Sequence, residues 1–345
     1  MDWSLILENG LKALVGTDAV VFALAAIGLN VHFGYTGLVN FGQVAFLAMG
    51  AYGIAMGVVT FGLSMWLAIF LGLFAAVVLA VLLGLPTLRL RSDYLAIVTI
   101  AAGEIVRLVL RSASLRGTTG GSDGLQAFAD PFFDINPLPG RGDGVAFGPI
   151  HLGEGGYGLF NITFGPNTTW VLIVGWTLVG LTSLMVWALM RSPWGRIVKS
   201  IREDEEAVRS LGKNVNWYKM QSLILGGVIG AIGGVIFAIS RQSVQPDNYS
   251  TALTFFAYTA LILGGTARIF GPIVGSMLFW SLLSFTDVTL RQAVANDLIP
   301  GDFLTGTRVG ILRFILVGLG LILLMVFRPQ GIFGDKKEVA IGERG

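Results

Sequence analysis

Long apolar stretches alternate with shorter polar ones along most of this chain. A membrane-spanning helix needs about 20 mostly apolar residues, so the pattern predicts an all-α polytopic membrane protein with roughly eight to ten transmembrane helices, some of them broken or re-entrant. Nothing indicates a separate soluble domain, and we expect residues 1–345 to form a single transmembrane domain. The candidate spans are Ala19–Phe33, Leu38–Phe61, Ser64–Thr87, Tyr94–Arg111, Thr169–Met190, Gln221–Ser240, Ala252–Thr266, Ile269–Phe285 and Val309–Phe327.

The longest charged run interrupts this pattern near the middle of the chain. It reads SPWGRIVKSIREDEEAVRSLGKNVNWYK, from Ser192 to Lys219, within a polar segment at residues 191–220. A charged segment of this length between two spans cannot lie in hydrocarbon, so it must lie in water at one membrane face. Ser192 followed by Pro193 is typical of a helix start, because serine can accept unpaired N–H groups and proline fits the first helical position.

A second short helix is expected later in the same segment. The carboxylates at residues 204–206 favour a helix N-terminus, Ala207, Val208 and Leu211 follow at helical spacing, and Gly212 can end the helix in a left-handed conformation. Two short helices with an apolar ridge in a charged surround could fit a groove on a partner. A solvated connector that touches nothing is the alternative, and these residues alone leave both open.

The distribution of lysine and arginine predicts the orientation, because basic residues are in excess in cytoplasmic loops. The segment 112–168 holds only Arg116 and Arg141 against five carboxylates, so we expect it to be extracytoplasmic. We expect the central segment and the C-terminus to be cytoplasmic. Nine complete crossings would put the N-terminus outside, whereas a broken or re-entrant Leu38–Phe61 would put it inside. The basic residues that set this expectation are Arg89, Arg91, Arg191, Arg196, Lys199, Arg202, Arg209, Lys213, Lys219, Arg328, Lys336 and Lys337.

Composition excludes several classes of function. The chain is 54% hydrophobic and 13% charged, against about 25% charged residues in average soluble domains. Its net charge of +2 gives no reason to expect nucleic acid as a partner. It has no cysteine, and its two histidines, His32 and His151, are far apart, so neither a thiol nucleophile nor a metal pair is expected. Gly264 and Gly265 are followed by Thr-Ala-Arg and not by the Gly-Lys-Ser/Thr of a phosphate loop. We expect no enzyme activity, no cofactor and no ATP hydrolysis by this chain itself.

Two glycine-interrupted apolar stretches, Gly34–Gly53 and Leu261–Leu278, lie in the two halves of the chain. Paired broken segments of this kind indicate a midplane pathway in transporters, because backbone that is not helical at membrane depth must line a cavity or be buried in protein. The candidate path residues are Asn40 and Gln43 on the first stretch and Gly264 and Gly265 on the second. The alternative is close helix packing, which explains glycines at four-residue spacing such as Gly226, Gly230 and Gly234.

Glu104 is an ionisable residue in the predicted span Tyr94–Arg111, with Arg107 one turn later. Intramembrane charges are costly and face a cavity or a partner. At three-residue spacing the two side chains can pair with each other. We favour this structural pairing, and direct contact of Glu104 with a transported solute is the alternative.

The extracytoplasmic segment contains the motif TTGGSDGL, whose glycines allow tight turns. An ordinary exposed turn is one interpretation. A docking surface for an external partner, carried by Gly120, Gly121, Ser122 and Asp123, is the other.

Several motifs occur in one order that resembles a known family. They are LNVHFGYTGLVNFGQVAFLAMGAY, LRLRSDYLAIVTIAAGEIVRLV, TGGSDGL, SPWGRIVKSIREDEEAVRSLG, ALILGGTARIFGPIVGSML and the final RPQGIFG. They resemble the branched-chain amino acid ABC transporter permeases of the LivM type, and the resemblance runs from about Leu29 to Phe333, nearly the whole chain. Each motif is modest alone, and their common order is specific to the family.

The resemblance implies a multi-pass importer subunit of the prokaryotic plasma (inner) membrane, surrounded by lipid. Such permeases work with a homologous second permease, two cytoplasmic ATPase subunits and an extracytoplasmic substrate-binding protein, and they move their solute by alternating access. The family's ATPase-coupling segment corresponds here to Pro193, Gly195, Arg196, Arg202, Glu203, Asp204, Glu205, Ala207, Leu211 and Gly212. The resemblance favours Leu, Ile and Val as solutes. Related permeases for urea and short amides share these motifs and remain the alternative. A stand-alone secondary transporter is a further alternative, but it would need more ionisable residues in its spans.

Overall fold

Three helices form the centre of the computed structural model, which describes residues 2–88, 92–138, 145–147, 150–152, 157–159, 162–296, 306–328 and 330–334. They are α2 (Thr17–Leu29), α3 (Gln43–Ala55) and α11 (Val215–Arg241). Every residue of α2 from position 19 to position 29 is buried, as expected for a helix that is apolar on all sides.

Glycines allow these central helices to approach closely. A Cβ on Gly226 of α11 would lie 2.4 Å from the Gly28 carbonyl oxygen of α2, and one on Gly234 would lie 1.9 Å from the Leu47 carbonyl oxygen of α3. The glycine row of α11 is therefore a packing surface, and the packing interpretation of these residues is confirmed.

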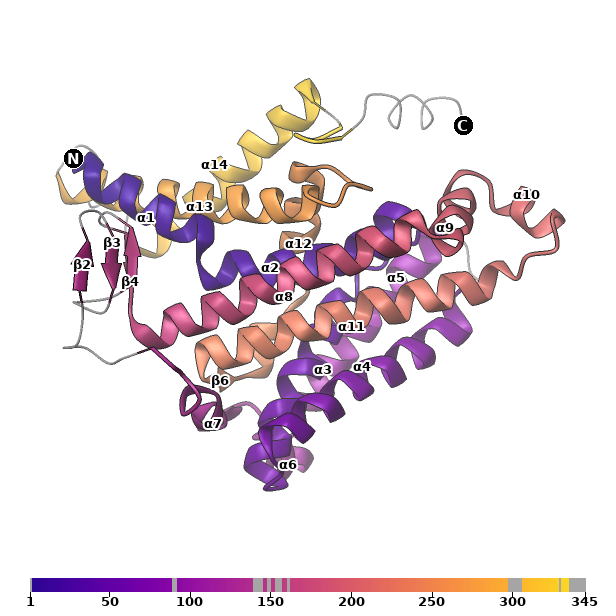
Figure 1. The fold of residues 1–345 in the computed structure, drawn as a ribbon, viewed down its shortest axis with the longest axis horizontal. Helices are drawn as coiled ribbons and strands as arrows, with labels where there is room; N and C mark the ends of the chain where they lie inside the picture. Colours follow the sequence, from indigo (N-terminus) through magenta and orange to yellow (C-terminus); the bar gives the residue numbers. More distant parts are fainter. Residues whose placement is uncertain are drawn as a thin grey trace.

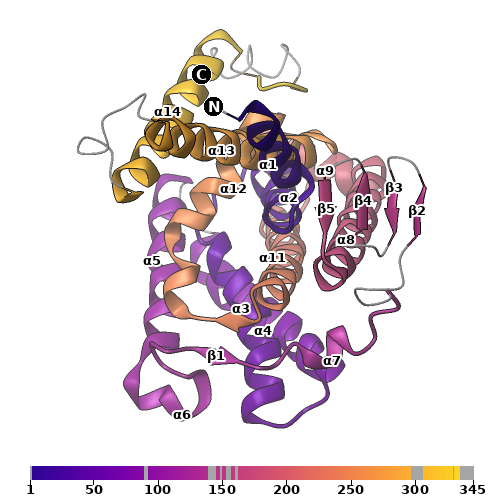
Figure 2. The same cartoon turned by 90° about the vertical axis from the view of Figure 1, so that its left-hand side faces the viewer.

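The other long helices in the described part of the chain surround this centre (Figure 1 and Figure 2). The helix α4 packs against α3 and α11, α8 against α2, and α13 against α1, α2 and α12. Their outer faces are apolar: on α4, Trp66, Phe70 and Phe74 are each more than half exposed. An apolar outer face fits a hydrocarbon surround. The bounds are α1 (Trp3–Val15), α4 (Met65–Thr87), α5 (Ser92–Arg111), α8 (Pro166–Arg191), α12 (Thr251–Gly264), α13 (Gly271–Ala295) and α14 (Gly306–Phe327).

Each of the nine apolar stretches named from the sequence contains a helix. Within the described residues, six helical segments are long and apolar enough to cross a membrane, and Thr251–Gly264 is apolar but shorter. The predicted all-α polytopic membrane fold is confirmed. The six segments are Trp3–Tyr35, Gln43–Thr60, Met65–Thr87, Pro166–Arg191, Val215–Arg241 and Gly271–Ala295.

The predicted break in the first glycine-interrupted stretch is present. The π-helix η1 (Asn30–Tyr35) continues α2, residues 37–42 are not helical, and the π-helix η2 (Met56–Thr60) continues α3. Side chains of other helices hold the non-helical residues: Phe41 N donates to Thr99 Oγ1 at 3.0 Å, and Tyr258 Oη donates to the Asn40 carbonyl at 2.8 Å. The irregular backbone is thus buried and hydrogen-bonded within the protein, as membrane depth requires.

The bundle has two different ends (Figure 1). One end carries the short helices α9 (Pro193–Glu203) and α10 (Glu205–Ser210). The opposite end carries η3 (Ala113–Leu115), α6 (Arg116–Thr119), α7 (Asp130–Phe133), η4 (Pro246–Tyr249) and a small sheet. The N-terminus lies at this second end, where Asp2 N donates to Gln292 Oε1 of α13 at 2.7 Å. The basic loop at Arg89 and Arg91 and the tail lysines lie outside the described residues.

The small sheet was not expected from the sequence. It is a four-stranded antiparallel meander of β2 (Val145–Phe147), β3 (Ile150–Leu152), β4 (Tyr157–Leu159) and β5 (Ile162–Phe164) in sequential order. A separate pair joins β1 (Leu125–Gln126) to β6 (Ser243–Val244), with Leu125 opposite Val244. Strands of two or three residues are too short to show the period-two alternation by which strands are recognised.

Candidate functional site

The helices α9 and α10 form a capped pair, called here the coupling knob (residues 192–212). Ser192 caps α9 by accepting from Gly195 N at 3.4 Å, and Asp204 caps α10 by accepting from Ala207 N at 3.0 Å. Gly212 follows α10 with φ +75°, the left-handed conformation that ends a helix. The helix starts and stops predicted from the sequence are confirmed, and each cap contributes about 1 kcal/mol to helix stability.

The apolar ridge predicted on α10 divides into two parts. Val208 is buried with Ile201 of α9 and Val215 of α11, so it holds the coupling knob together. Ala207 and Leu211 face outward, and Leu211 is 78% exposed. An exposed leucine in a charged surround is the part of the ridge that a partner could contact.

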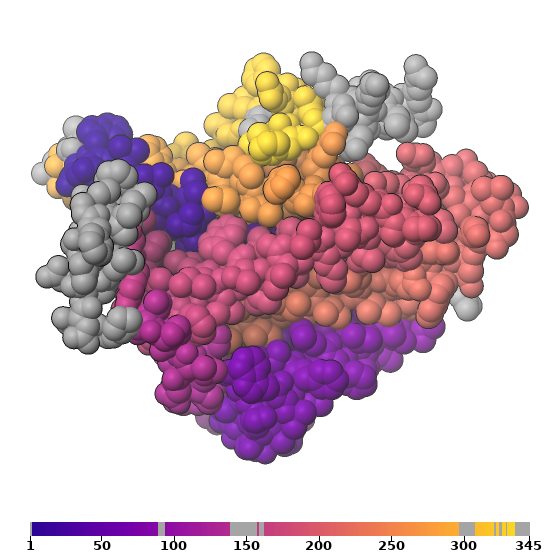
Figure 3. All heavy atoms as spheres, viewed as in Figure 1, coloured from indigo at the N-terminus to yellow at the C-terminus, as the bar shows by residue number. Residues whose placement is uncertain are grey.

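Most of the predicted coupling residues lie on the surface of the knob, which projects at the right-hand end of the molecule in Figure 3. Gly195 is instead buried: a Cβ there would lie 2.5 Å from the Leu189 carbonyl oxygen, so glycine permits the tight turn from α8 into α9. Glu205 is half-buried and pairs with Arg209 at 2.8 Å and with Lys219 of α11. The exposed members are Pro193, Arg196, Arg202, Glu203, Asp204, Ala207, Leu211 and Gly212.

The candidate path residues on the first stretch are fully buried. Asn40 accepts from Gly42 N at 2.9 Å through its side chain, and its Nδ2 has no hydrogen-bond partner among the described residues. Gln43 donates to the Gly226 carbonyl at 3.2 Å and lies 3.2 Å from His32 Nε2. His32 is a buried polar residue that the sequence did not single out, because its neighbours in the chain give no sign of a partner eleven residues away.

On the second stretch, α12 ends at Gly264 and α13 begins at Gly271, and this interruption is the second helix break. Gly264 and Gly265 allow backbone segments to meet there. A Cβ on Gly264 would lie 1.7 Å from the Gly271 carbonyl oxygen, and Gly265 has φ +110° with the backbone of Gly334 beside it. Both glycines are buried. The C-terminal motif closes this junction: Ile332 N donates to the Leu263 carbonyl and Phe333 N to the Gly264 carbonyl, each at 3.0 Å.

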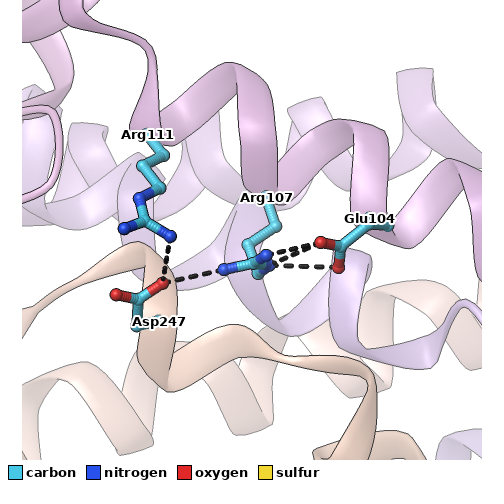
Figure 4. A network of polar contacts seen from close by, with 4 residues as sticks. All are labelled: Glu104, Arg107, Arg111 and Asp247. Carbon is cyan, nitrogen blue, oxygen red and sulfur yellow. Dashed lines mark hydrogen bonds and ion pairs between the residues drawn. The ribbon is translucent and has the colours of Figure 1, made fainter.

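Glu104 belongs to a four-residue ionic network (Figure 4). Its carboxylate accepts from Arg107 at 2.5–3.1 Å, which is the pairing expected from the sequence. Arg107 also donates to Asp247 of η4 at 2.8 Å, and Arg111 donates to the same oxygen at 3.2 Å. The network ties α5 to the α11–α12 connection, a contact across 140 positions that spacing along one helix cannot reveal.

The four residues of the candidate outer docking loop lie at the end of the bundle opposite the coupling knob. Gly120 and Gly121 have φ of +76° and +60°, so they form the tight turn expected. Ser122 and Asp123 are exposed, and Asp123 pairs with Arg116 at 2.6 Å. The β1–β6 pair then fixes this loop to the start of the α11–α12 connection.

In the part of the chain that the structure describes, no group of three His, Asp or Glu side chains could hold a metal ion. What the geometry provides is a charged, partner-accessible knob at one end, a loop at the other, and two buried helix breaks between them.

Comparison with known proteins identifies the family. The family described as "Branched-chain amino acid transport system / permease component" matches residues 13–306. The high-affinity branched-chain amino acid transport system permease protein LivM of Salmonella typhimurium is 29% identical over 336 residues, which cover 96% of this chain and 71% of that protein. The probable LivM permease of Methanocaldococcus jannaschii is 21% identical over 361 residues, covering 92% and 91%.

A shorter similarity extends to a permease of a different import system. The autoinducer 2 import system permease protein LsrC of Photorhabdus laumondii is 28% identical over 134 residues, 37% of this chain and 40% of that protein. The match to the first family covers most of the chain, including both helix breaks and the coupling knob. The chain therefore belongs to the family of permease components of branched-chain amino acid transport systems.

Proposed function

We propose that this chain is the permease subunit of an ATP-binding-cassette importer that moves branched-chain or related amino acids across the plasma membrane. Separate ATPase subunits drive its alternating access, and the chain itself provides half of the solute path. A homologous second permease provides the other half. The observation that carries this proposal is the coupling knob: two capped helices between two long apolar helices, at one end of a multi-pass bundle.

The proposed orientation puts the coupling knob in the cytoplasm. Arg196, Arg202 and Arg209 are among the basic residues exposed at this end, and basic residues favour the cytoplasmic side. The N-terminus lies at the opposite end, beside Gln292, so this orientation makes it extracytoplasmic. The whole chain is then one permease domain, with residues 112–168 outside and 191–220 inside.

The ATPase subunits would dock on the outward face of the coupling knob. Leu211 and Ala207 supply an apolar contact, and the exposed charged residues of α9 and α10 set orientation and association rate. ATP must bind the two states of the importer with different affinity, because only differential binding shifts a conformational equilibrium. At the other end, the exposed loop at Gly120–Asp123 would receive the substrate-binding protein.

The solute class is proposed from the family description and the LivM relatives. Asn40 and Gln43 are the candidate path residues for a zwitterionic amino acid, and Glu104 lies toward the outer end of the same pathway. These residues are buried or paired in the present conformation, so contact with solute requires the helix breaks to rearrange. The similarity to LsrC is the reason to test solutes beyond amino acids.

The deciding experiment is affinity purification of the chain with its partners, followed by calorimetric screening of the copurified binding protein. We expect two ATPase subunits in the complex and tight binding of Leu, Ile or Val. Binding of urea or a short amide would keep the mechanism and replace the solute. Solute transport without any ATPase subunit would overturn the proposal in favour of a secondary transporter.

Charge reversal at Glu203 tests the docking role of the coupling knob. Glu203 is exposed, whereas Glu205 also pairs with Arg209 and Lys219, so Glu203→Lys leaves the knob's own ion pairs intact. We expect affinity for the ATPase subunits to fall about tenfold, equivalent to about 1.4 kcal/mol. Asp134→Lys, an exposed change at the opposite end, is the control. Equal affinity for Glu203→Lys and the unmodified chain would contradict docking at this face.

A further inference from the structure

Arg202 reaches from the coupling knob into the first helix break. It lies one residue before the end of α9, and its Nη1 donates to the Gly34 carbonyl oxygen at 2.5 Å, across 168 positions of sequence. Gly34 belongs to η1, which ends at Tyr35. The last carbonyls of a helix lack helical partners, and Arg202 supplies one of them with a charged donor, which makes the stronger kind of hydrogen bond.

The break is shaped to receive this side chain. Gly37 has φ +75°, and a Cβ there would lie 3.3 Å from Arg202 Cγ. A side chain at position 37 would therefore be strained in its backbone and crowded against the arginine stem. Lys199 makes a second contact between α9 and η1, with its ammonium 5.7 Å from the centre of the Tyr35 ring.

Beyond Gly34, the contacts continue to the second helix break. A Cβ on Gly34 would lie 2.0 Å from Asn30 Oδ1 and 2.9 Å from Ala267 N, so the backbone of η1 rests directly on this junction. Asn30 is 1% exposed. Its side chain accepts from Ala267 N and donates to the Arg268 carbonyl, both at 2.8 Å.

A cavity of about 220 Å³ lies beside the Arg202 contact. Its walls include Thr36, Gly37, Ile201, Glu205 and Lys219. No side chain of the described residues fills this space, which leaves room beside the contact for α9 to shift.

We propose that Arg202 is the positioning residue that transmits motion of the coupling knob to both helix breaks. It acts through the Gly34 carbonyl and then through Asn30, and it does not touch the solute. This inference rests on the proposed function and adds the route from the ATPase docking face to the two broken segments. The two glycine-interrupted stretches thereby move as one unit when α9 moves.

The test uses the complete importer, reconstituted in vesicles with its ATPase subunits and binding protein. Arg202→Met removes the donor and keeps a long unbranched side chain, and Arg202→Lys restores a charged donor. Lys213→Met, an exposed change in the loop after α10, is the charge-matched control. The chain has no cysteine, so Thr266→Cys introduces a single thiol at the second break, whose labelling by maleimide is measured with and without ATP.

We expect solute uptake per ATP hydrolysed to fall about tenfold in Arg202→Met, within the range of coupling between distant sites. We also expect the ATP-dependent change in labelling at Thr266→Cys to disappear in this variant. Arg202→Lys should recover part of both effects, and Lys213→Met should retain them. If Arg202 has a purely structural role, Arg202→Met should lower the melting temperature and leave the uptake per ATP and the labelling change intact.

The inference is overturned if Arg202→Met keeps the uptake per ATP and the labelling change of the unmodified chain. It is also overturned if Lys213→Met abolishes the uptake per ATP and the labelling change equally. Basic charge at this end of the bundle, and not the Gly34 contact, would then matter. If Arg202→Met does not assemble, Arg202→Lys decides by the same two measurements. Failure of the proposed function would appear separately, as ATP-independent uptake by the unmodified importer.

Discussion

In the first glycine-interrupted stretch the interruption spans residues 37–42 and is held by side chains, whereas in the second it lies between α12 and α13 and is held largely by backbone. Thr99, Thr254 and Tyr258 provide hydrogen bonds to residues 40–44 of the first stretch. In the second, the backbone N–H groups of Ile332 and Phe333 donate hydrogen bonds, and the backbone of Gly264 lies directly against that of Gly271. Side chains can change rotamer during a movement, but two backbones in contact cannot separate without losing their hydrogen bonds. The first break is therefore the adaptable one, whereas the second is fixed in its own internal structure and moves only as a whole.

The largest effect is expected from Gly264→Ala in the fixed break. A Cβ there would lie 1.7 Å from the Gly271 carbonyl oxygen and near its Cα, and no flexible side chain can yield. We expect the free energy of unfolding to fall by about 3 kcal/mol, at the upper end of overpacking costs. Thermal unfolding of the purified chain measures it. The control is Gly180→Ala on α8, where no atom lies within 4 Å of an added Cβ. Equal melting temperatures for the two variants would contradict the distinction between the breaks.

An intermediate effect is expected from Asn30→Ala, which separates the two breaks. The substitution removes the hydrogen bonds to Ala267 N and to the Arg268 carbonyl. At about 1 kcal/mol each, their loss should lower the free energy of unfolding by about 2 kcal/mol. Asn9→Ala, which loses a single exposed hydrogen bond to the Leu5 carbonyl, serves for comparison. A destabilisation no larger than that of Asn9→Ala would mean that the breaks are not coupled through this side chain.

The smallest effect is expected from Thr254→Val in the adaptable break. Thr254 Oγ1 accepts from Val44 N at 3.0 Å and so provides a partner for a backbone N–H group in the first turn of α3. Valine keeps the shape of threonine and removes the acceptor. The free energy of unfolding should fall by about 1 kcal/mol, as for the loss of a helix cap. Hydrogen exchange at the first turn of α3 should become faster. The control is Thr177→Val, because the Thr177 hydroxyl donates to the Ile173 carbonyl of its own helix. This control should leave hydrogen exchange in α3 unchanged. Unchanged exchange in Thr254→Val would show that the first break is not held by side chains.

Local patterns in the sequence were enough to predict the helices and the shape of the coupling knob. Ser192, Asp204 and Gly212 determine where short helices begin and end through their own backbone neighbours, so their roles are readable within a few residues. The pairing of Glu104 with Arg107 is local in the same sense. The division of the ridge into buried Val208 and exposed Leu211 was not predicted, because it depends on where α11 passes beneath α10.

The contacts that connect distant segments could not be predicted. Arg202 with Gly34, Asn30 with Ala267, and Asp247 with Arg107 each join residues more than one hundred positions apart. No periodicity or spacing encodes such pairs, since they arise only when the helices have packed. Glycines gave the one sequence signal of these junctions, because Gly34 and Gly264 lie where neighbouring atoms approach too closely for any Cβ, and Gly37 has a positive φ.

The hydrogen bonds from Ile332 and Phe333 also have a consequence for biosynthesis. The carbonyls of Leu263 and Gly264 emerge from the ribosome on the order of 70 residues before their donors, which at about 5–20 residues per second is a delay of roughly 4–14 s. During that interval the end of α12 carries unpaired carbonyls at a junction that will later be buried. A nascent chain stalled before the motif RPQGIFG would therefore leave both carbonyls without these donors, and the second break would close only once the C-terminal residues have been synthesised.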